Sequence, residues 1–105
     1  MKTMAELDPL RQEFLEQTAQ ISWRELQPYY ARGAVVLVAP GMDLVEIAAQ
    51  LRLDNKQRFE EWLAEGKVSG VTDAVAASLF EENPTVWAVV VAPWVLVQRI
   101  TTDDA

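Results

Sequence analysis

Residues 86–99 have the sequence VWAVVVAPWVLVQR, two valine-rich pieces joined by Ala92-Pro93. Such β-branched and aromatic residues favour strands. One straight strand over this stretch would be roughly 40 Å long at about 3.3 Å per residue, too long for a domain with a radius of gyration of about 13 Å. The chain must therefore bend at Ala92-Pro93. Because Ala-Pro lacks the positive φ that a tight hairpin favours, we expect a bulge or corner there, with Pro93 on an edge strand.

A second valine-rich run, AVVLVA at residues 34–39, ends at the turn-forming pair Pro40-Gly41. A short apolar run without polar alternation is typical of a strand that is covered on both faces of its sheet. Residues 68–71 are expected to form either a further short strand or an extended link. The sequence thus predicts a small sheet.

The N-terminal part of the chain predicts an amphipathic helix. Asp8 is a suitable N-cap, and Pro9 is a suitable first helical residue. Leu10, Phe14 and Ile21 recur at helical spacing, so we expect one apolar stripe that faces the core.

A second, shorter helix is predicted from Trp23, because Ser22 and Glu25 have the spacing of a capping box. Pro28 limits its length, since proline lacks the backbone N–H that a helix interior requires. Gly33 is a suitable end for this helix.

Three further helices are predicted, each after its own N-cap candidate: Asp43, the pair at 54–55 and the pair at 72–73. The first of them has the clearest helical pattern in the chain, with apolar side chains at Leu44, Ile47, Ala48 and Leu51. Asn83-Pro84 ends the last helix. Helices that precede and separate strands favour an α/β domain.

We therefore expect one small domain over residues 1–105, of the α/β class or alternatively the α+β class, with helices packed on a small mixed sheet. The ends, residues 1–7 and 101–105, are expected to be loose. The composition is 50% hydrophobic and 24% charged, a balance typical of globular rather than disordered chains.

Charge and composition exclude several classes of function. Sixteen acidic residues against nine basic ones give a net charge of −7, and no cluster of Lys or Arg offers a nucleic-acid surface. The chain has no histidine and no cysteine, so it lacks disulfides, thiolate or imidazole metal ligands and His-dependent nucleophilic catalysis. No apolar run reaches the roughly 18 residues of a membrane span. We expect a cytoplasmic protein that does not contact a membrane.

The remaining side chains that could act in catalysis or bind a metal are carboxylates. Their positions favour solvent exposure instead. Glu60-Glu61 are neighbours on a predicted helix and point apart, because residues on one helix face are three or four positions distant. Glu81-Glu82 end another helix. We predict no catalytic residue, no metal site and no cofactor, and we expect that the protein is not an enzyme.

The four tryptophans are the most unusual content of the chain. Trp87 and Trp94 lie on either side of the predicted bend, and an exposed indole beside an edge strand would form a partner surface. We predict that Trp87, Trp94 and Gln98 belong to such a surface. The leading hypothesis is a protein–protein interaction module that binds another protein, or a second copy of itself through an edge strand.

Two alternatives remain open. The first is a domain that binds a small molecule or a metal ion with carboxylate chemistry, for which Tyr29, Asp43 and Glu46 are the pocket candidates. A deep pocket onto which these side chains converge would favour it.

The second alternative is a winged-helix-like nucleic-acid regulator, because the helices predicted over 44–52 and 56–65 have the length and spacing of a helix-turn-helix pair. Arg52, Lys56 and Arg58 are its basic candidates. The acidic residues among them make this pair a poor reader of the major groove, so we do not expect nucleic-acid binding.

With these pieces in place, the chain resembles a bacterial family of domains of unknown function, number 2288, over residues 8–98. The resemblance rests on residues 23–26, 31–33, 43–48, 62–63, 66–68 and, most specifically, WAVVVAPWVLVQ at 87–98. Pro28 departs from the family pattern. The resemblance implies a bacterial cytosolic protein, and it implies no activity, cofactor or catalytic residue.

Overall fold

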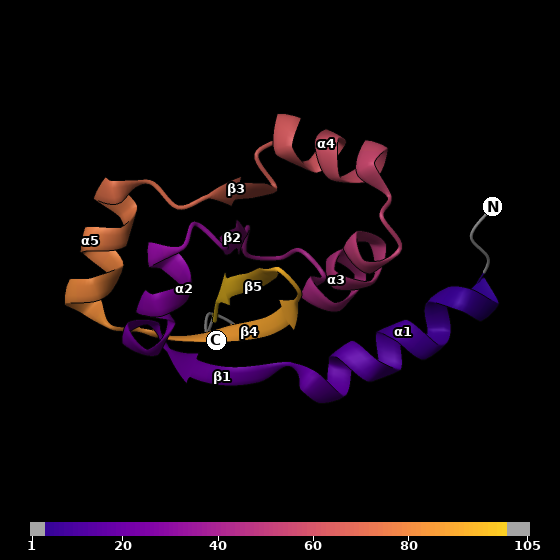
Figure 1. The fold of residues 1–105 in the computed structure, drawn as a ribbon, viewed down its shortest axis with the longest axis horizontal. Coiled ribbons are helices and arrows are strands. Elements are labelled where there is room, and N and C mark those ends of the chain that lie inside the picture. Colours follow the sequence, from indigo (N-terminus) through magenta and orange to yellow (C-terminus); the bar gives the residue numbers. More distant parts are fainter. Residues whose placement is uncertain (1–3, 101–105) are drawn as a thin grey trace.

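The protein is built on a five-stranded mixed sheet, which the computed structural model describes within residues 4–100 (Figure 1). The spatial order is β1-β4-β5-β2-β3; β5 and β2 are parallel, and the other neighbours are antiparallel. The strands are β1 (Ala19–Ser22), β2 (Val35–Val38), β3 (Val68–Gly70), β4 (Thr85–Val91) and β5 (Trp94–Arg99). Such a mixed sheet with helices agrees with the predicted class in its α+β form.

Helices cover both faces of the sheet and enclose two separate cores (Figure 1). One face carries α1 (Met4–Gln17), α3 (Leu44–Arg52) and α4 (Lys56–Ala64), and the other carries the 3-10 helix η1 (Trp23–Leu26), α2 (Gln27–Ala31) and α5 (Asp73–Glu82). Leu96 belongs to the first core, whereas its neighbours Val95 and Val97 belong to the second. This double coverage explains why β5 is apolar without alternation.

The C-terminal stretch forms a hairpin, and our expectation of a bulge or corner at an edge was wrong. Val91 pairs with Trp94, so Ala92 and Pro93 alone connect β4 to β5. The Ala92-Pro93 peptide bond is cis, and turns with a cis-proline at the third position form a known class. Strand 94–99 lies between β4 and β2. The edges of the sheet are β1 and β3 instead.

The N-terminal helix begins earlier and ends earlier than the sequence indicates. It starts at Met4, within the expected loose end, and Pro9 lies inside it. A proline removes one backbone hydrogen bond, and here the helix continues on both sides of it. Phe14 packs in the core as expected, at 1% exposure. Ile21 lies in β1 rather than on the helix, because the helix ends at Gln17.

The other elements follow their predicted signals. Residues 35–38 form a strand, and Asp43, Asn55 and Thr72 each accept a hydrogen bond from the first turn of the helix that follows. The helix predicted from Trp23 is split into η1 and α2, with Pro28 in the first turn of α2, where a missing N–H is tolerated. The expected loose tail at 101–105 lies outside the described residues.

An ion pair joins α1 to α3. Arg11 Nε donates to Glu46 Oε1 at 2.6 Å, and Gln50 Nε2 donates to the other carboxylate oxygen at 2.8 Å. The hydrogen bond from Arg11 lowers the pKa of Glu46 below its ordinary value of 4.5, against a smaller opposing effect of burial.

Glu46→Gln should therefore destabilise the protein in a pH-dependent way. Because the pKa of Glu46 is lower in the folded than in the unfolded state, the carboxylate stabilises the fold above pH 4.5, and this stabilisation is lost as the pH falls through the folded pKa. Urea unfolding on both sides of pH 4.5 measures the difference between wild type and variant. The difference in free energy of unfolding should be smaller below pH 4.5 than above it. A difference that does not change with pH would contradict the lowered pKa of Glu46.

Candidate functional site

Trp87 and Gln98 form a cross-strand pair on the face of the sheet that carries α1 and α3. Gln98 is 9% exposed, and its Nε2 donates to the carbonyl oxygens of Ala39 and Met42 at 2.9 and 2.8 Å. The amide thereby ties the end of β5 to the loop between β2 and α3. Gln98 is thus a structural brace for this loop, and its predicted place on a partner surface stays a prediction.

A hollow of about 430 Å³ opens beside this pair, between the end of α1 and the start of α3. We name it the Trp87 groove; it is lined by Leu15, Thr18, Met42, Asp43, Leu44, Val45, Trp87 and Gln98. Leu15 is 60% exposed at its margin, while Trp87 is half-buried. The structure thus brings together three predicted site residues, Trp87, Gln98 and Asp43. Sequence reasoning missed Leu15, which lies off the predicted apolar stripe.

The polar side chains of the Trp87 groove make structural hydrogen bonds. Asp43 Oδ1 accepts from the backbone N–H of Glu46 at 3.1 Å, and Thr18 Oγ1 donates to the carbonyl of Phe14 at 2.6 Å. Together with the Gln98 brace, these bonds leave the groove with a mainly apolar surface. Such a lining suits an aliphatic or aromatic group better than an ion.

Trp94 lies at a different place from Trp87. It pairs with Val91 at the turn of the hairpin, four residues along β4 from Trp87, which corresponds to roughly 13 Å at about 3.3 Å per residue. Trp94 is 39% exposed, and Val90 beside the same turn is 53% exposed. The two tryptophans therefore contribute to separate surfaces.

The three pocket candidates do not converge. Glu46 is held by Arg11, Asp43 lines the Trp87 groove, and Tyr29 belongs to the core on the opposite face. Tyr29 lines a hollow of about 200 Å³ whose other walls include Ile21 and Val90. Among residues 8–100, whose side chains the structure describes, no three acidic side chains gather in the way that a metal site requires.

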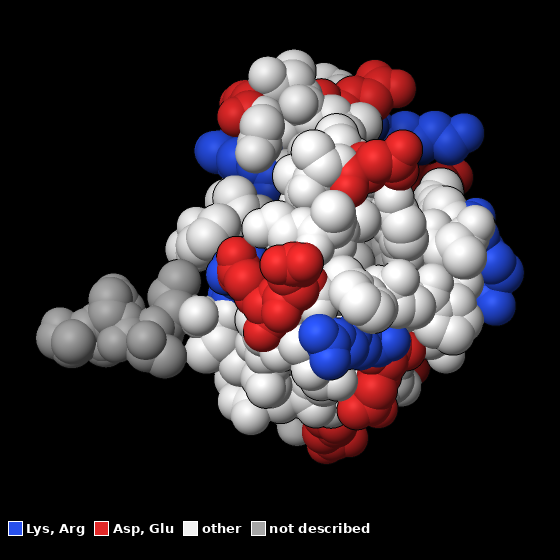
Figure 2. Space-filling view, turned by 90° about the vertical axis from the view of Figure 1, so that its left-hand side faces the viewer, with Lys and Arg blue, Asp and Glu red and all other residues white. Residues whose placement is uncertain are grey.

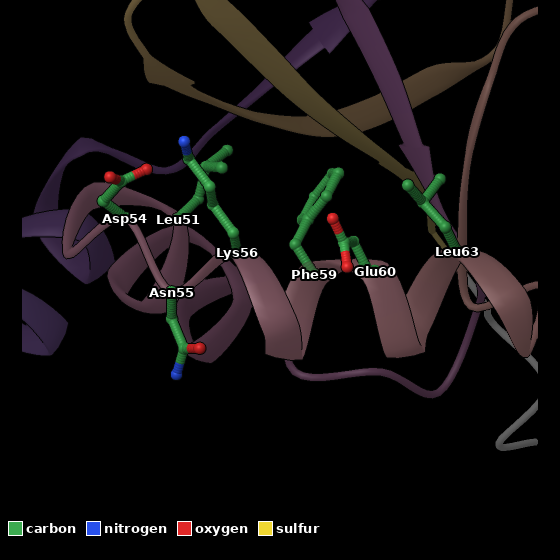
Figure 3. Close-up of a pocket in the computed structure, with 7 residues that line it drawn as sticks. All are labelled: Leu51, Asp54, Asn55, Lys56, Phe59, Glu60 and Leu63. Carbon is green, nitrogen blue, oxygen red and sulfur yellow. The ribbon is translucent and has the colours of Figure 1, made fainter.

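A further hollow, of about 250 Å³, lies between α3 and α4 (Figure 3). Leu51, Phe59 and Leu63 form its apolar wall, and the ammonium of Lys56 extends beside Leu51. Figure 3 shows Asn55 turned away from it, as its role as N-cap of α4 requires. Trp62 takes the core position and Leu63 remains 46% exposed.

The two arginines of the α3–α4 pair lie close to carboxylates. Arg52 Nη1 is 3.9 Å from Glu13 Oε2. Arg58 Nη1 is 3.7 Å from Glu61 Oε1, and the same guanidinium lies over the Trp62 ring. Each arginine therefore has an acidic neighbour, which reduces the positive potential that a phosphate backbone would meet.

Comparison with known proteins identifies the family. A family model described as "protein of unknown function", DUF2288, matches residues 9–99. The chain belongs to the DUF2288 family. A solution NMR structure of PA1075 from Pseudomonas aeruginosa is similar to this DUF2288 protein, with 42% sequence identity and a TM-score of 0.78. The similarity covers 100% of this chain and 97% of that one. No curated protein matches the chain.

Membership of DUF2288 confirms the resemblance drawn from the sequence, and it adds no chemistry to the site. None of the described helices combines the length and apolarity that a membrane crossing requires. The function of this DUF2288 protein must therefore be argued from its surfaces.

Gln98→Leu should loosen the loop that forms one wall of the Trp87 groove. The substitution removes the Gln98 donor from both carbonyls, so that Met42 O loses this partner while Ala39 O keeps the backbone N–H of Met42 at 3.2 Å, and the free energy of unfolding should fall by about 1–3 kcal/mol. Chemical denaturation measures this change. Gln20→Leu, at an exposed position on β1, is the matched control and should change stability by less than about 0.5 kcal/mol. If both substitutions changed the free energy of unfolding equally, the hydrogen bonds of Gln98 would contribute nothing to stability.

Proposed function

We propose that this DUF2288 protein is a non-enzymatic protein–protein interaction module whose partner inserts an apolar side chain into the Trp87 groove. The observation that carries the proposal is the combination of an apolar hollow with an exposed Leu15 at its margin. Apolar side chains enclosed by a polar rim are typical of interface centres. The structural bonds of the polar lining argue against an acid–base role for these groups.

The neighbouring edge strand extends this surface. Gln20 of β1 is the cross-strand neighbour of Trp87, and β1 has β4 as its sole partner among the described strands. An extended segment of a partner that adds to β1 would place alternate side chains on the face that carries the groove. Charged side chains and prolines usually protect an edge strand from pairing with another chain. Residues 18–22 contain neither.

Charge favours a partner other than a second copy. The net charge is −7, and like-charged copies repel each other. Asp43 is an exposed carboxylate in the groove lining, so the preferred segment carries a basic residue next to its apolar one. The absence of cysteine supports a cytoplasmic location for this interaction.

Substitution of Leu15 tests the proposal. Leu15→Glu puts a charge at the groove margin, where a partner would have to bury it, so binding should weaken at least about tenfold, the equivalent of about 1.4 kcal/mol. The wild type and the variant are each immobilised and exposed to a lysate of the native cells. Proteins retained by the wild type are identified and then purified for affinity measurement.

Leu63→Glu is the matched control, because Leu63 is also an exposed leucine on a helix and lies at the separate α3–α4 hollow. A partner of the Trp87 groove should be retained by the wild type and by Leu63→Glu, and lost from Leu15→Glu. Retention of the same proteins by all three would contradict the proposed surface.

A further inference from the structure

Strand β1 leaves part of its backbone without a partner on the outer edge of the sheet. Figure 1 shows β1 along one margin of the molecule, with no further described strand beyond it. The N–H of Trp23 donates to the carbonyl of Pro84 at 2.9 Å, directly after the last paired residues, Ser22 and Thr85. Bonded and non-bonded positions alternate along an antiparallel pair. Among the described residues, the N–H and C=O of Gln20 and the N–H of Ser22 therefore point away from β4 and have no backbone partner.

A second apolar hollow lies beside β1, on the opposite face of the sheet from the Trp87 groove. Its volume is about 200 Å³, and its lining includes Ala19, Ile21, Ala88 and Val90. Ala19 and Ala88 are cross-strand neighbours, and two adjacent methyl groups leave room above them for a longer side chain. We name this space the Ala88 hollow. Apolar recesses thus lie beside β1 on both faces of the sheet.

These two hollows determine which side-chain pattern suits a strand that adds to β1. Successive side chains of a strand point to opposite faces of the sheet. On one face the added strand would lie next to Gln20, beside the Trp87 groove, and on the other face it would lie next to Ala19, beside the Ala88 hollow. Apolar side chains at consecutive positions would therefore be buried on both faces, as they are in β5 at the centre of this sheet. A strand with alternating polar residues would leave one hollow unfilled.

Two carboxylates without an ion pair lie before and after β1, Glu16 in the last turn of α1 and Glu25 in η1. Glu16 accepts from the side chain of Gln12 at 3.0 Å, and Glu25 accepts from the hydroxyl of Ser22 at 3.2 Å. Among residues 8–100, no lysine or arginine pairs with either carboxylate. Basic residues at both ends of the added strand would supply these missing counter-charges. The side that carries α5 offers no such preference, because Figure 2 shows Lys and Arg interspersed with Asp and Glu there.

We propose that the partner segment is an extended strand with apolar residues at consecutive positions and a basic residue at each end. This inference rests on the proposed function, because side chains on one face of the segment occupy the Trp87 groove. The backbone of the segment bonds to Gln20 and Ser22, and the side chains of its other face fill the Ala88 hollow. Such sequences are typical of strands that are covered on both faces. The partner therefore presents an unpaired segment, which becomes the sixth strand of the sheet.

Synthetic peptides test the side-chain pattern of the partner segment. The probe KKVLVLKK has consecutive apolar residues between basic ends, whereas KKVTVTKK and KKTLTLKK have apolar residues at alternate positions only. Binding of the labelled peptides to the full-length protein is measured by fluorescence polarisation. We expect saturable binding of KKVLVLKK and at least about tenfold weaker binding of both alternating peptides, because each leaves one hollow without an apolar group. The peptide EEVLVLEE should also bind at least about tenfold more weakly, because its acidic ends face the carboxylates beside β1.

A substitution on β1 tests the Ala88 hollow. Ala19→Gln places a polar side chain over the hollow from an exposed position, so the variant should bind KKVLVLKK at least about fivefold more weakly than the wild type. Ala77→Gln makes the same change at an exposed position of α5 and should bind the peptide like the wild type. Thermal unfolding of each variant verifies that it is folded.

Hydrogen exchange tests the backbone pairing. The protein labelled with nitrogen-15 is followed by NMR with and without saturating KKVLVLKK. The amides of Gln20 and Ser22 should exchange at least about tenfold more slowly in the complex, because carbonyl groups of the peptide accept from them. The amide of Ile21 bonds to β4 already in the free protein, so its exchange should change less. KKVLVLKK that is N-methylated at its apolar residues lacks the backbone donors and should bind at least about tenfold more weakly.

Several results would overturn the inference. They are the absence of saturable binding of KKVLVLKK, equal binding of this peptide and the alternating ones, wild-type affinity of Ala19→Gln, and unchanged exchange at Gln20 and Ser22 in the complex. The proposed function has its own test in Leu15→Glu. A cellular partner that is lost from Leu15→Glu but retained by Ala19→Gln would reject the two-sided strand and leave the Trp87 groove as the interaction site.

Discussion

The parallel pairing of β5 with β2 is the constraint on which the rest of the structure depends. It places β5 in the middle of the sheet, with β4 along its other edge. Parallel neighbours cannot be joined by a tight turn and need a long crossover. The chain between β2 and β5 accordingly runs through α3 and α4 on one face and through α5 on the other. Both faces of the central strands are covered as a result. The edges of the sheet are formed by the two short strands β1 and β3.

Elements with local signals could be predicted from the sequence. An N-cap such as Asp43 and the apolar spacing after it are encoded within one or two helical turns, and the structure shows the helix there. Strand β1 was missed, because Ile21 is its sole large apolar side chain and its partner in β4 is 65 positions away, at Val86. The hairpin was mistaken for a corner because Ala92-Pro93 does not belong to the common two-residue turns.

The candidate site shows the same division between local and distant information. Asp43 and Trp87 share one groove although 44 positions separate them along the chain, and this proximity follows from strand register rather than from any motif. A residue's face is likewise a matter of register, because a shift by one position reverses every side chain of a strand. The sequence could thus single out Trp87 and Gln98 as candidates. It could not show that the Gln98 side chain is turned inward as a brace, or that Tyr29 lies on the other face of the sheet.

The Gln98 brace has a thermodynamic consequence for any molecule that binds above it. Its two hydrogen bonds fix the loop that contributes Met42 and Asp43 to the wall of the Trp87 groove. A loop that is ordered before binding loses little conformational entropy when the complex forms, which is the general advantage of preorganisation. The shape of this groove is thus set by the interior of the sheet, so a binding partner meets a surface that is already ordered.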